Sequence, residues 1–248
     1  MRAVILAAGR GSRMSALTED RPKCLVELAQ KPLIRRQIAA LGGGGVSSIG
    51  IVRGYLANKI NIEDVTYFEN PRWAETNMVM SLVVAAAWMR SDSVVISYAD
   101  IFYGRDVVRS LAAAPGDLVV TYDRNWRSLW TRRFADPLSD AETFRTDAGG
   151  NLIEIGRRAT RIEEVEGQYM GLLKFTPEAW RAVEAVLAAM DAKARDAMDM
   201  TTLLRALLES GFPIKTVGIT GQWGEIDNSS DLELYEKMIR EGELCVES

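Results

Sequence analysis

The chain has 248 residues, of which 48% are hydrophobic and 26% charged, a balance typical of globular proteins rather than fibrous or disordered ones. Its 30 Lys and Arg residues against 34 Asp and Glu give a formal net charge of -4, so the composition offers no basic surface for nucleic acid or an anionic membrane. Histidine is absent, which excludes Ser-His-Asp and Cys-His hydrolases and histidine-based metalloproteases. Any catalysis must rest on carboxylates, Lys, Arg or a metal ion.

Length and cysteine content indicate a single domain in a reducing compartment. Hydrophobic cores seldom split below about 250 residues. The two cysteines, Cys24 and Cys245, form neither a disulfide framework nor a thiolate zinc motif. The apolar run 3–8 is too short for a signal peptide, and no run reaches the roughly 18 residues of a membrane span. We expect a cytoplasmic protein without membrane or nucleic-acid partners; its oligomeric state stays open, a homodimer being one alternative.

The first half of the chain alternates between short apolar runs and amphipathic stretches. Pro32 precedes one such stretch and glycines 42–45 follow it, as is typical of a helix. Regular alternation of strands and helices favours a mostly parallel sheet. We expect strands at 2–6, 46–52, 66–68, 93–98 and 118–122, and helices at 32–41, 75–89 and 106–113.

The second half is less regular. From Asn125 the sequence shows no clear period, which indicates a long loop or an insertion, and we place an insertion at about 124–170. A glycine turn at 147–151 predicts a hairpin, after which the sheet becomes mixed. The whole chain, 1–248, is thus predicted to be one α/β domain with a Rossmann-like, mixed, mostly parallel sheet flanked by helices. We expect strands at 144–146, 152–155, 169–175, 214–219 and 223–227, and helices at 176–190, 200–208 and 231–239.

A glycine-rich segment follows the first strand. Gly9 and Gly11 let backbone N–H groups approach phosphate oxygens, and Arg13 and Lys23 bring positive charge nearby. A P-loop would need G-x-x-x-x-G-K-[ST], and the dinucleotide fingerprint would need a small residue where Met14 stands. An ordinary glycine turn and a solvated surface lysine remain alternatives, but the combination predicts a triphosphate-binding loop.

This segment carries a family resemblance. Leu6-Ala-Ala-Gly-Arg-Gly-Ser-Arg13, followed by Arg21-Pro-Lys-Cys-Leu-Val26 and Lys31-Pro-Leu-Ile34, resembles the N-terminal signature of nucleoside-triphosphate transferases, which include sugar-nucleotide and cytidylyl transferases. Later, Ser97-Tyr-Ala-Asp100-Ile101 and Glu225-Ile-Asp227-Asn228 are similar to the places where that superfamily carries its two magnesium aspartates. The resemblance implies catalytic roles for Lys23 and Arg13 and a nucleotide site at Leu6, Ala7, Ala8, Gly9, Gly11 and Ser12.

Asp100 and Asp227 each end a predicted strand, so both can reach the crevice beyond the carboxyl ends of a parallel sheet and hold Mg²⁺. Each could instead cap a helix. Magnesium suits the implied chemistry, because attack on an α-phosphate needs charge neutralisation and alignment. An acceptor with a phosphate or phosphonate oxygen is already ionised at neutral pH and needs no general base, which fits the absence of histidine.

Two further segments concern the base and the acceptor. Asn77-Met-Val-Met-Ser81-Leu82 is similar to phosphocholine and phosphonate cytidylyltransferases, which implies that Ser81 lies near a cytosine; a polar interruption of a core helix is the alternative.

The tract 124–134 holds four arginines and two tryptophans. The arginines favour a phosphonate acceptor, because guanidinium groups bind phosphonate oxygens in pairs of hydrogen bonds. The tryptophans leave phosphocholine open, because a quaternary ammonium prefers aromatic walls. An exposed basic loop is the remaining alternative. The predicted acceptor-binding residues are Asn77, Trp130, Arg132, Arg133 and Tyr169.

With 136–144 and 167–173, this tract is most similar to cytidylyltransferases of phosphonate metabolism. We therefore predict a Mg²⁺-dependent cytidylyltransferase that transfers CMP from CTP to a small phosphonate or phosphomonoester and releases pyrophosphate. A phosphocholine cytidylyltransferase and a sugar-1-phosphate nucleotidyltransferase remain alternatives. A catalytically silent nucleotide-binding protein is disfavoured, because Arg13, Lys23, Asp100 and Asp227 are all present.

Overall fold

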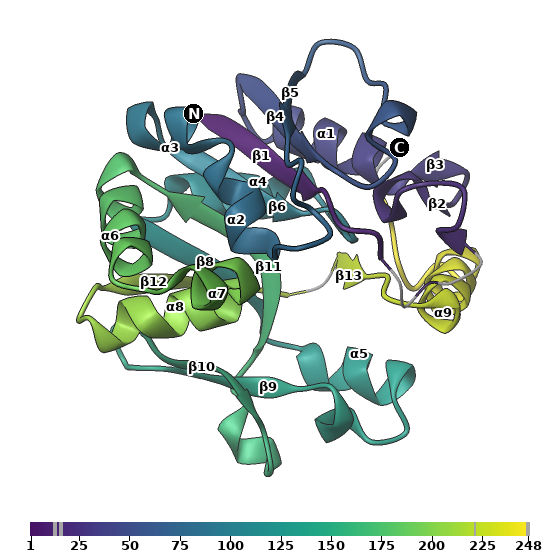
Figure 1. Ribbon diagram of the computed structural model, residues 1–248. Helices are drawn as coiled ribbons and strands as arrows, with labels where there is room; N and C mark the ends of the chain where they lie inside the picture. The colour runs from purple at the N-terminus through teal and green to yellow at the C-terminus, as the bar shows by residue number, and fades with distance from the viewer. Residues whose placement is uncertain (12–13, 15–16, 221, 247–248) are drawn as a thin grey trace.

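The computed structural model describes residues 1–11, 14, 17–220 and 222–246. A seven-stranded sheet forms its centre (Figure 1). The strand β11 runs antiparallel to both of its neighbours, and the other pairings in this sheet are parallel. The predicted fold class, α/β with a mixed, mostly parallel sheet, is thereby confirmed. The strand order is β12 (Ile214–Ile219), β8 (Leu118–Asp123), β11 (Gln168–Phe175), β6 (Val94–Tyr98), β1 (Arg2–Ala7), β4 (Ser48–Arg53) and β5 (Thr66–Glu69).

Helices cover both faces of this sheet, because its central strands are apolar on both sides. In β1, Val4 faces one hydrophobic cluster while Ala3 and Ile5 face the other, as the alternation of side chains along a strand requires. The Val4 face is covered by α2 (Met78–Val83), α3 (Ala86–Ser91), α6 (Pro177–Ala188) and α8 (Met200–Glu209), and α7 (Ala192–Ala197) precedes α8. The opposite face is covered by α1 (Leu33–Gly43), α4 (Arg105–Ala113) and α5 (Trp126–Arg133).

Three small antiparallel ribbons lie outside the main sheet. They are β9 (Glu142–Thr146) with β10 (Leu152–Arg158), β7 (Ile101–Tyr103) with β13 (Trp223–Glu225), and β2 (Glu27–Leu28) with β3 (Lys31–Pro32). The last helix, α9 (Ser229–Arg240), packs through Tyr235 into a separate hydrophobic cluster with Leu28 and Phe102. The β7–β13 ribbon therefore joins the C-terminal segment to the end of β6.

Most predicted elements are found near their expected positions, with instructive exceptions. The tract from Asn125, expected to be irregular, contains α5, in which Trp126 and Trp130 are buried at a helical spacing of four. The expected helix at 75–89 is two short helices, α2 and α3. Among the helices of the described residues, none has the length and hydropathy needed to cross a membrane.

Candidate active site

A cavity of about 310 Å³ opens at the carboxyl ends of β1 and β6, which are adjacent in the sheet. This is the edge at which open α/β sheets bind ligands. Ser81 of α2 forms part of its wall, and Asp100 lies at its margin just after β6. Ser12 and Arg13 lie outside the described residues. The predicted nucleotide-binding residues that the structure describes all line this cavity: Leu6, Ala7, Ala8, Gly9, Gly11 and Ser81.

Gly11 sets the shape of the loop. It has a φ of +68°, and a Cβ there would lie 2.9 Å from the Cβ of Lys23. Only glycine combines this backbone conformation with so close an approach. The carbonyl of Gly11 accepts hydrogen bonds from Met14 N at 3.0 Å and from the Thr18 hydroxyl at 3.1 Å. Gly11 thus lets the loop fold directly against Lys23.

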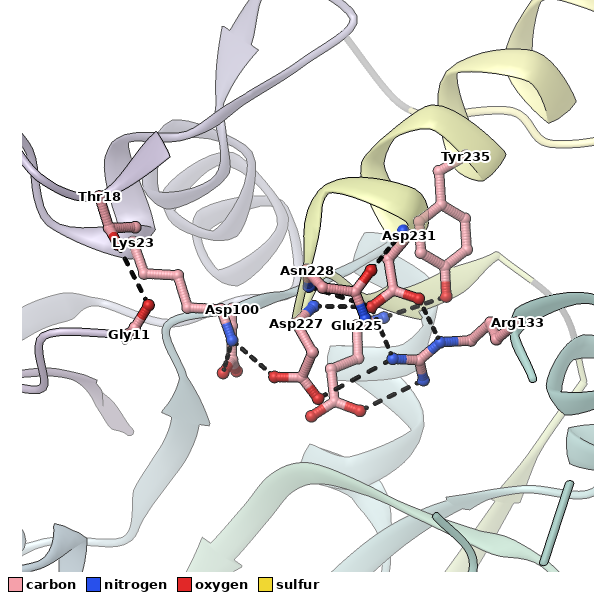
Figure 2. A network of polar contacts seen from close by, with 10 residues as sticks. All are labelled: Gly11, Thr18, Lys23, Asp100, Arg133, Glu225, Asp227, Asn228, Asp231 and Tyr235. Atoms are coloured by element: carbon pink, nitrogen blue, oxygen red, sulfur yellow. Dashed lines mark hydrogen bonds and ion pairs between the residues drawn. The ribbon is translucent and has the colours of Figure 1, made fainter. Parts of the chain in front are cut away.

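Lys23 lies in a short 3-10 helix, Lys23–Leu25, and bridges two carboxylates (Figure 2). Its Nζ donates to Asp100 Oδ2 at 2.8 Å and to Asp227 Oδ1 at 2.7 Å. Burial lowers the pKa of Lys23, but the two carboxylates outweigh burial and raise it. The ammonium group is therefore charged, and it joins a residue at the start of the chain to one at its end.

Glu225 completes a group of three carboxylates with Asp100 and Asp227. One oxygen of each lies within 4.8 Å of the others. Asp100 Oδ1 is buried and accepts no hydrogen bond from the described residues. Oxygen ligands of this kind suit Mg²⁺, so the three side chains fit such an ion. Burial, followed by the charges of Asp227 and Asp100, raises the pKa of Glu225 well above its usual value.

Glu225 is absent from the predicted metal residues, although the sequence contains a signal for it. Residues two apart on a strand project to the same side, and Glu225 stands two positions before Asp227 at the end of β13. The expectation that Asp227 ends a strand of the main sheet is wrong. β13 pairs instead with β7, which places Glu225 opposite Ile101, and Ile226 N donates to Asp100 O at 3.0 Å.

The structure excludes the alternative in which the side chain of Asp227 caps helix α9. The N-cap of α9 is Asn228, whose Oδ1 accepts from Asp231 N at 2.9 Å. Asp231 in turn accepts from the backbone N–H of Asp227 at 2.9 Å. The carboxylate of Asp227 is therefore directed away from the helix end and toward Lys23.

A second cavity, of about 270 Å³, adjoins the first, since Met78 and Tyr98 line both. Among the residues that the structure describes, no Lys or Arg lines it. Burial, and then the negative charge of Asp199, raises the pKa of Glu142. Its carboxylates are Asp140, Glu142, Asp199, Glu225 and Asp227.

Tyr169, predicted to bind the acceptor, lines this second cavity. Its ring meets that of Tyr98 edge to face at 5.9 Å. The β11 strand has an irregular register between Tyr169 and Leu173. Gly171, with a φ of +72°, lies at this irregularity, and a Cβ there would come within 2.6 Å of the Tyr98 ring. Glycine is therefore needed for the two tyrosines to meet at the cavity wall.

The other predicted acceptor residues line no part of this cavity. Trp130 is fully buried and stacks on Trp223 at 6.1 Å, so its predicted contact with the acceptor is wrong. Arg132 pairs with Glu243 near the C-terminus. The side chain of Arg133 is 0% exposed, held among carboxylates, which contradicts a direct contact with the acceptor. Asn77 caps α2, accepting from Met78 N at 2.8 Å, and lines the first cavity.

Comparisons with known proteins identify the family of this chain. The sequence profile of the family described as "MobA-like NTP transferase domain" matches residues 3–200. A CTP:phosphoglutamine cytidylyltransferase from Campylobacter jejuni is 40% identical over 94% of this chain and 98% of its own. A 2-aminoethylphosphonate cytidylyltransferase from Lancefieldella rimae is 29% identical over 62% of this chain and 60% of its own.

Among solved structures, the inositol-1-phosphate CTP transferase from T. maritima superimposes with a TM-score of 0.74 at 19% identity, covering 98% of each chain. At this identity the likeness establishes the fold. The family profile and the full-length relative go further. The chain therefore belongs to the MobA-like NTP transferase family and is a nucleotidyltransferase.

Proposed function

We propose that this enzyme is a cytidylyltransferase that transfers CMP from CTP to a small acceptor bearing both a phosphate-type oxygen and an ammonium group, with phosphoglutamine as the first candidate. One observation carries the proposal. A glycine-lined cavity and an acidic cavity adjoin each other, with Asp100 on the first and Asp227 on the second. Lys23 bridges these two aspartates. A nucleotidyl group can therefore pass from a donor in one cavity to an acceptor in the other.

The glycine-lined cavity supports the donor half. Backbone N–H groups around Gly9 and Gly11 suit the oxygens of a triphosphate. At the other end, Asn70 Nδ2 donates to Ser81 Oγ at 3.0 Å, which leaves the Ser81 hydroxyl hydrogen available for a carbonyl of the base. The choice of cytosine rests on the two relatives, both of which are cytidylyltransferases.

The residues between the cavities support the transfer step. An oxygen of the acceptor attacks the α-phosphorus of CTP, the bond to the β-phosphate oxygen breaks, and pyrophosphate leaves. Lys23 donates hydrogen bonds to phosphate oxygens as their charge shifts toward the leaving group. Mg²⁺ held by Asp100, Glu225 and Asp227 would neutralise phosphate charge and align the reacting groups. No side chain has to remove a proton, because the attacking oxygen is already ionised.

The acidic cavity supports an acceptor with an amine. The described lining of this cavity carries five carboxylates, and Arg205, which is outside the lining, is a cation that lowers the pKa of Glu142. An acceptor with only a phosphonate would add negative charge to them, whereas a cationic partner would offset that charge. An ammonium group supplies that partner, while the phosphate end lies toward Lys23. Glutamine and 2-aminoethylphosphonate each carry an amine. The acceptors in the names of the two relatives are phosphoglutamine and 2-aminoethylphosphonate.

The proposal is tested by a matrix of Mg²⁺-dependent pyrophosphate release. The donors are CTP, UTP, ATP, GTP and dTTP; the acceptors are phosphoglutamine, 2-aminoethylphosphonate, ethylphosphonate, phosphocholine and glucose-1-phosphate. We expect turnover with CTP and an amine-bearing acceptor. The matched pair is 2-aminoethylphosphonate and ethylphosphonate, for which we expect kcat/KM to differ about 100-fold. Equal rates for that pair would rule out the ammonium group, and turnover with the sugar phosphate would overturn the acceptor class.

A further inference from the structure

Arg133 lies beside the cluster of carboxylates formed by Asp100, Glu225 and Asp227 (Figure 2), and it lines neither cavity. It is the last residue of α5, and its side chain is 0% exposed. The guanidinium carbon lies 4.6 Å from the ring centre of Trp130 and 5.0 Å from that of Phe134. These aromatic rings fix the plane of the guanidinium group. An arginine buried this completely must have its charge compensated by close partners.

Those partners are carboxylates of the C-terminal segment. Arg133 Nε and Nη2 donate to the two oxygens of Asp231 at 2.9 and 3.0 Å, a bidentate pair. Arg133 Nη1 donates to Glu225 Oε2 at 3.4 Å, and Nη2 lies 3.9 Å from Asp227 Oδ2. A planar guanidinium with five donors can form this bidentate pair and still reach two other carboxylates, whereas a lysine has no such fork of donors.

Asp231 passes this constraint on to the backbone of the site. Its Oδ2 accepts from the N–H groups of Asp227 and Asn228, at 2.9 and 3.3 Å. Arg133 therefore fixes Asp227 twice: its backbone through Asp231, and its side chain through the ion pair. Glu225 is fixed by the direct hydrogen bond.

The charges of this cluster also give Arg133 a role in its arrangement. In the part of the chain that the structure describes, four carboxylates lie together here, those of Asp100, Glu225, Asp227 and Asp231, and Lys23 and Arg133 are cationic partners of them. With every group ionised the cluster carries a formal charge of minus two, which one divalent cation would cancel. Without Arg133, like charges would push the carboxylates apart.

We propose that Arg133 is a positioning residue that holds Glu225 and Asp227 in the arrangement needed to bind a divalent cation. This inference rests on the metal site of the proposed function. Partners that orient metal ligands typically change metal affinity about 10- to 100-fold when removed. Arg133 acts through the carboxylates and lines neither of the two cavities.

The test measures metal binding without turnover. Mn²⁺ is titrated into enzyme with CTP and no acceptor, and free Mn²⁺ is followed by electron paramagnetic resonance. We expect Arg133→Met to raise the Mn²⁺ dissociation constant about 10- to 100-fold, with Arg133→Lys in between, because it restores the charge but not the fork. The Mg²⁺ concentration for half-maximal activity should rise in parallel, while the KM for CTP at saturating Mg²⁺ changes much less. The matched control is Arg109→Met, an exposed arginine paired with Asp106, which should leave Mn²⁺ binding unchanged.

Each outcome decides the matter. An unchanged Mn²⁺ constant in a folded Arg133→Met protein, even one with a lower Tm, would make Arg133 merely structural and overturn the inference. If that variant does not fold, Asp231→Asn is tested instead. The single amide oxygen of the asparagine can still accept the backbone N–H groups, but the bidentate ion pair with Arg133 is lost. An unchanged Mn²⁺ dissociation constant in this variant overturns the inference too. A wild-type protein that binds no Mn²⁺ would contradict the metal site itself, a separate failure.

Discussion

The two adjoining cavities differ in how they are built, and the difference explains which of them leaves a mark on the sequence. The glycine-lined cavity takes much of its wall from one stretch at the end of β1, Leu6 to Gly11, whose backbone groups would meet the proposed donor. The acidic cavity draws its carboxylates from separate segments, with Glu142 on β9, Asp199 before α8 and Glu225 on β13. Recognition by backbone requires a local motif, whereas recognition by side chains requires only that the fold bring them together.

The carboxylates at the junction should give the largest effect. Asp100→Asn and Asp227→Asn each remove a negative charge from the proposed metal site, and we expect kcat to fall about a thousandfold or more. The measurement is pyrophosphate release at saturating substrates, with the thermal unfolding midpoint as control. Normal turnover in both variants would show that the two cavities do not share a metal site.

Lys23 comes next, because it touches both aspartates and faces the first cavity. For Lys23→Ala we expect kcat to drop about 100- to 1,000-fold, the range seen when one donor to a developing charge is removed. Single-turnover measurements with CTP separate the chemical step from release. A variant that keeps its kcat and loses only affinity for CTP would make Lys23 a binding group and not a catalytic one.

Glu142→Gln distinguishes the two cavities from each other. Loss of this charge should raise the KM for an amine-bearing acceptor about tenfold, equivalent to about 1.4 kcal/mol, and leave the KM for CTP within a factor of about two. Steady-state kinetics with each substrate varied in turn provide the measurement. Glu178→Gln, an exposed residue paired with Arg181 on α6, is the matched control, and a parallel rise in both KM values would argue against an acceptor subsite.

The pH dependence sharpens the same distinction. Burial, and then the negative charge of Asp199, raises the pKa of Glu142. Arg205 opposes this rise, and Asp140 adds to it. The ionised carboxylate binds the ammonium group, so binding holds above this raised pKa and is lost as the pH falls through it. We expect the acceptor KM to rise as the pH falls from 7.5 toward 5.5, about tenfold at most, and the rise to disappear in Glu142→Gln. A rise of equal size in that variant would assign the effect to another group.

Arg132→Ala should have the smallest effect. The sequence predicts an acceptor contact for Arg132, whereas the structure pairs it with Glu243 outside both cavities. Exposed ion pairs contribute little, about 0 to 1 kcal/mol, so both KM values should stay within about twofold of wild type. A selective increase in the acceptor KM would restore the arginine-based interpretation and weaken the one based on carboxylates.

How much of the structure can be predicted from the sequence depends on whether an interaction is local in the chain or joins distant segments. Hydrophobic periodicity is local, and it predicts every strand of the main sheet. The glycine loop and Asp100 follow their strands directly and are predictable for the same reason. The arginine tract misleads because its composition says nothing about burial: Trp126 and Trp130 turn one side of α5 into the core, and Arg133 is drawn inward with them. Neither the β7–β13 pairing nor the gathering of carboxylates from distant segments has a local signature.

The position of Lys23 has a consequence for the order in which ligands enter. Its Nζ lies 2.8 and 2.7 Å from one oxygen each of Asp100 and Asp227, while magnesium sits about 2.1 Å from its oxygen ligands. Ammonium and metal ion cannot occupy the space between those two oxygens together. If Mg²⁺ took the place between these two oxygens, Lys23 would have to exchange its carboxylate partners for other anions, and the phosphates of a nucleotide would be available to it. A metal–nucleotide complex would then enter as one unit, and Lys23, which pairs with two aspartates in this structure, would pair with phosphates when that complex is bound.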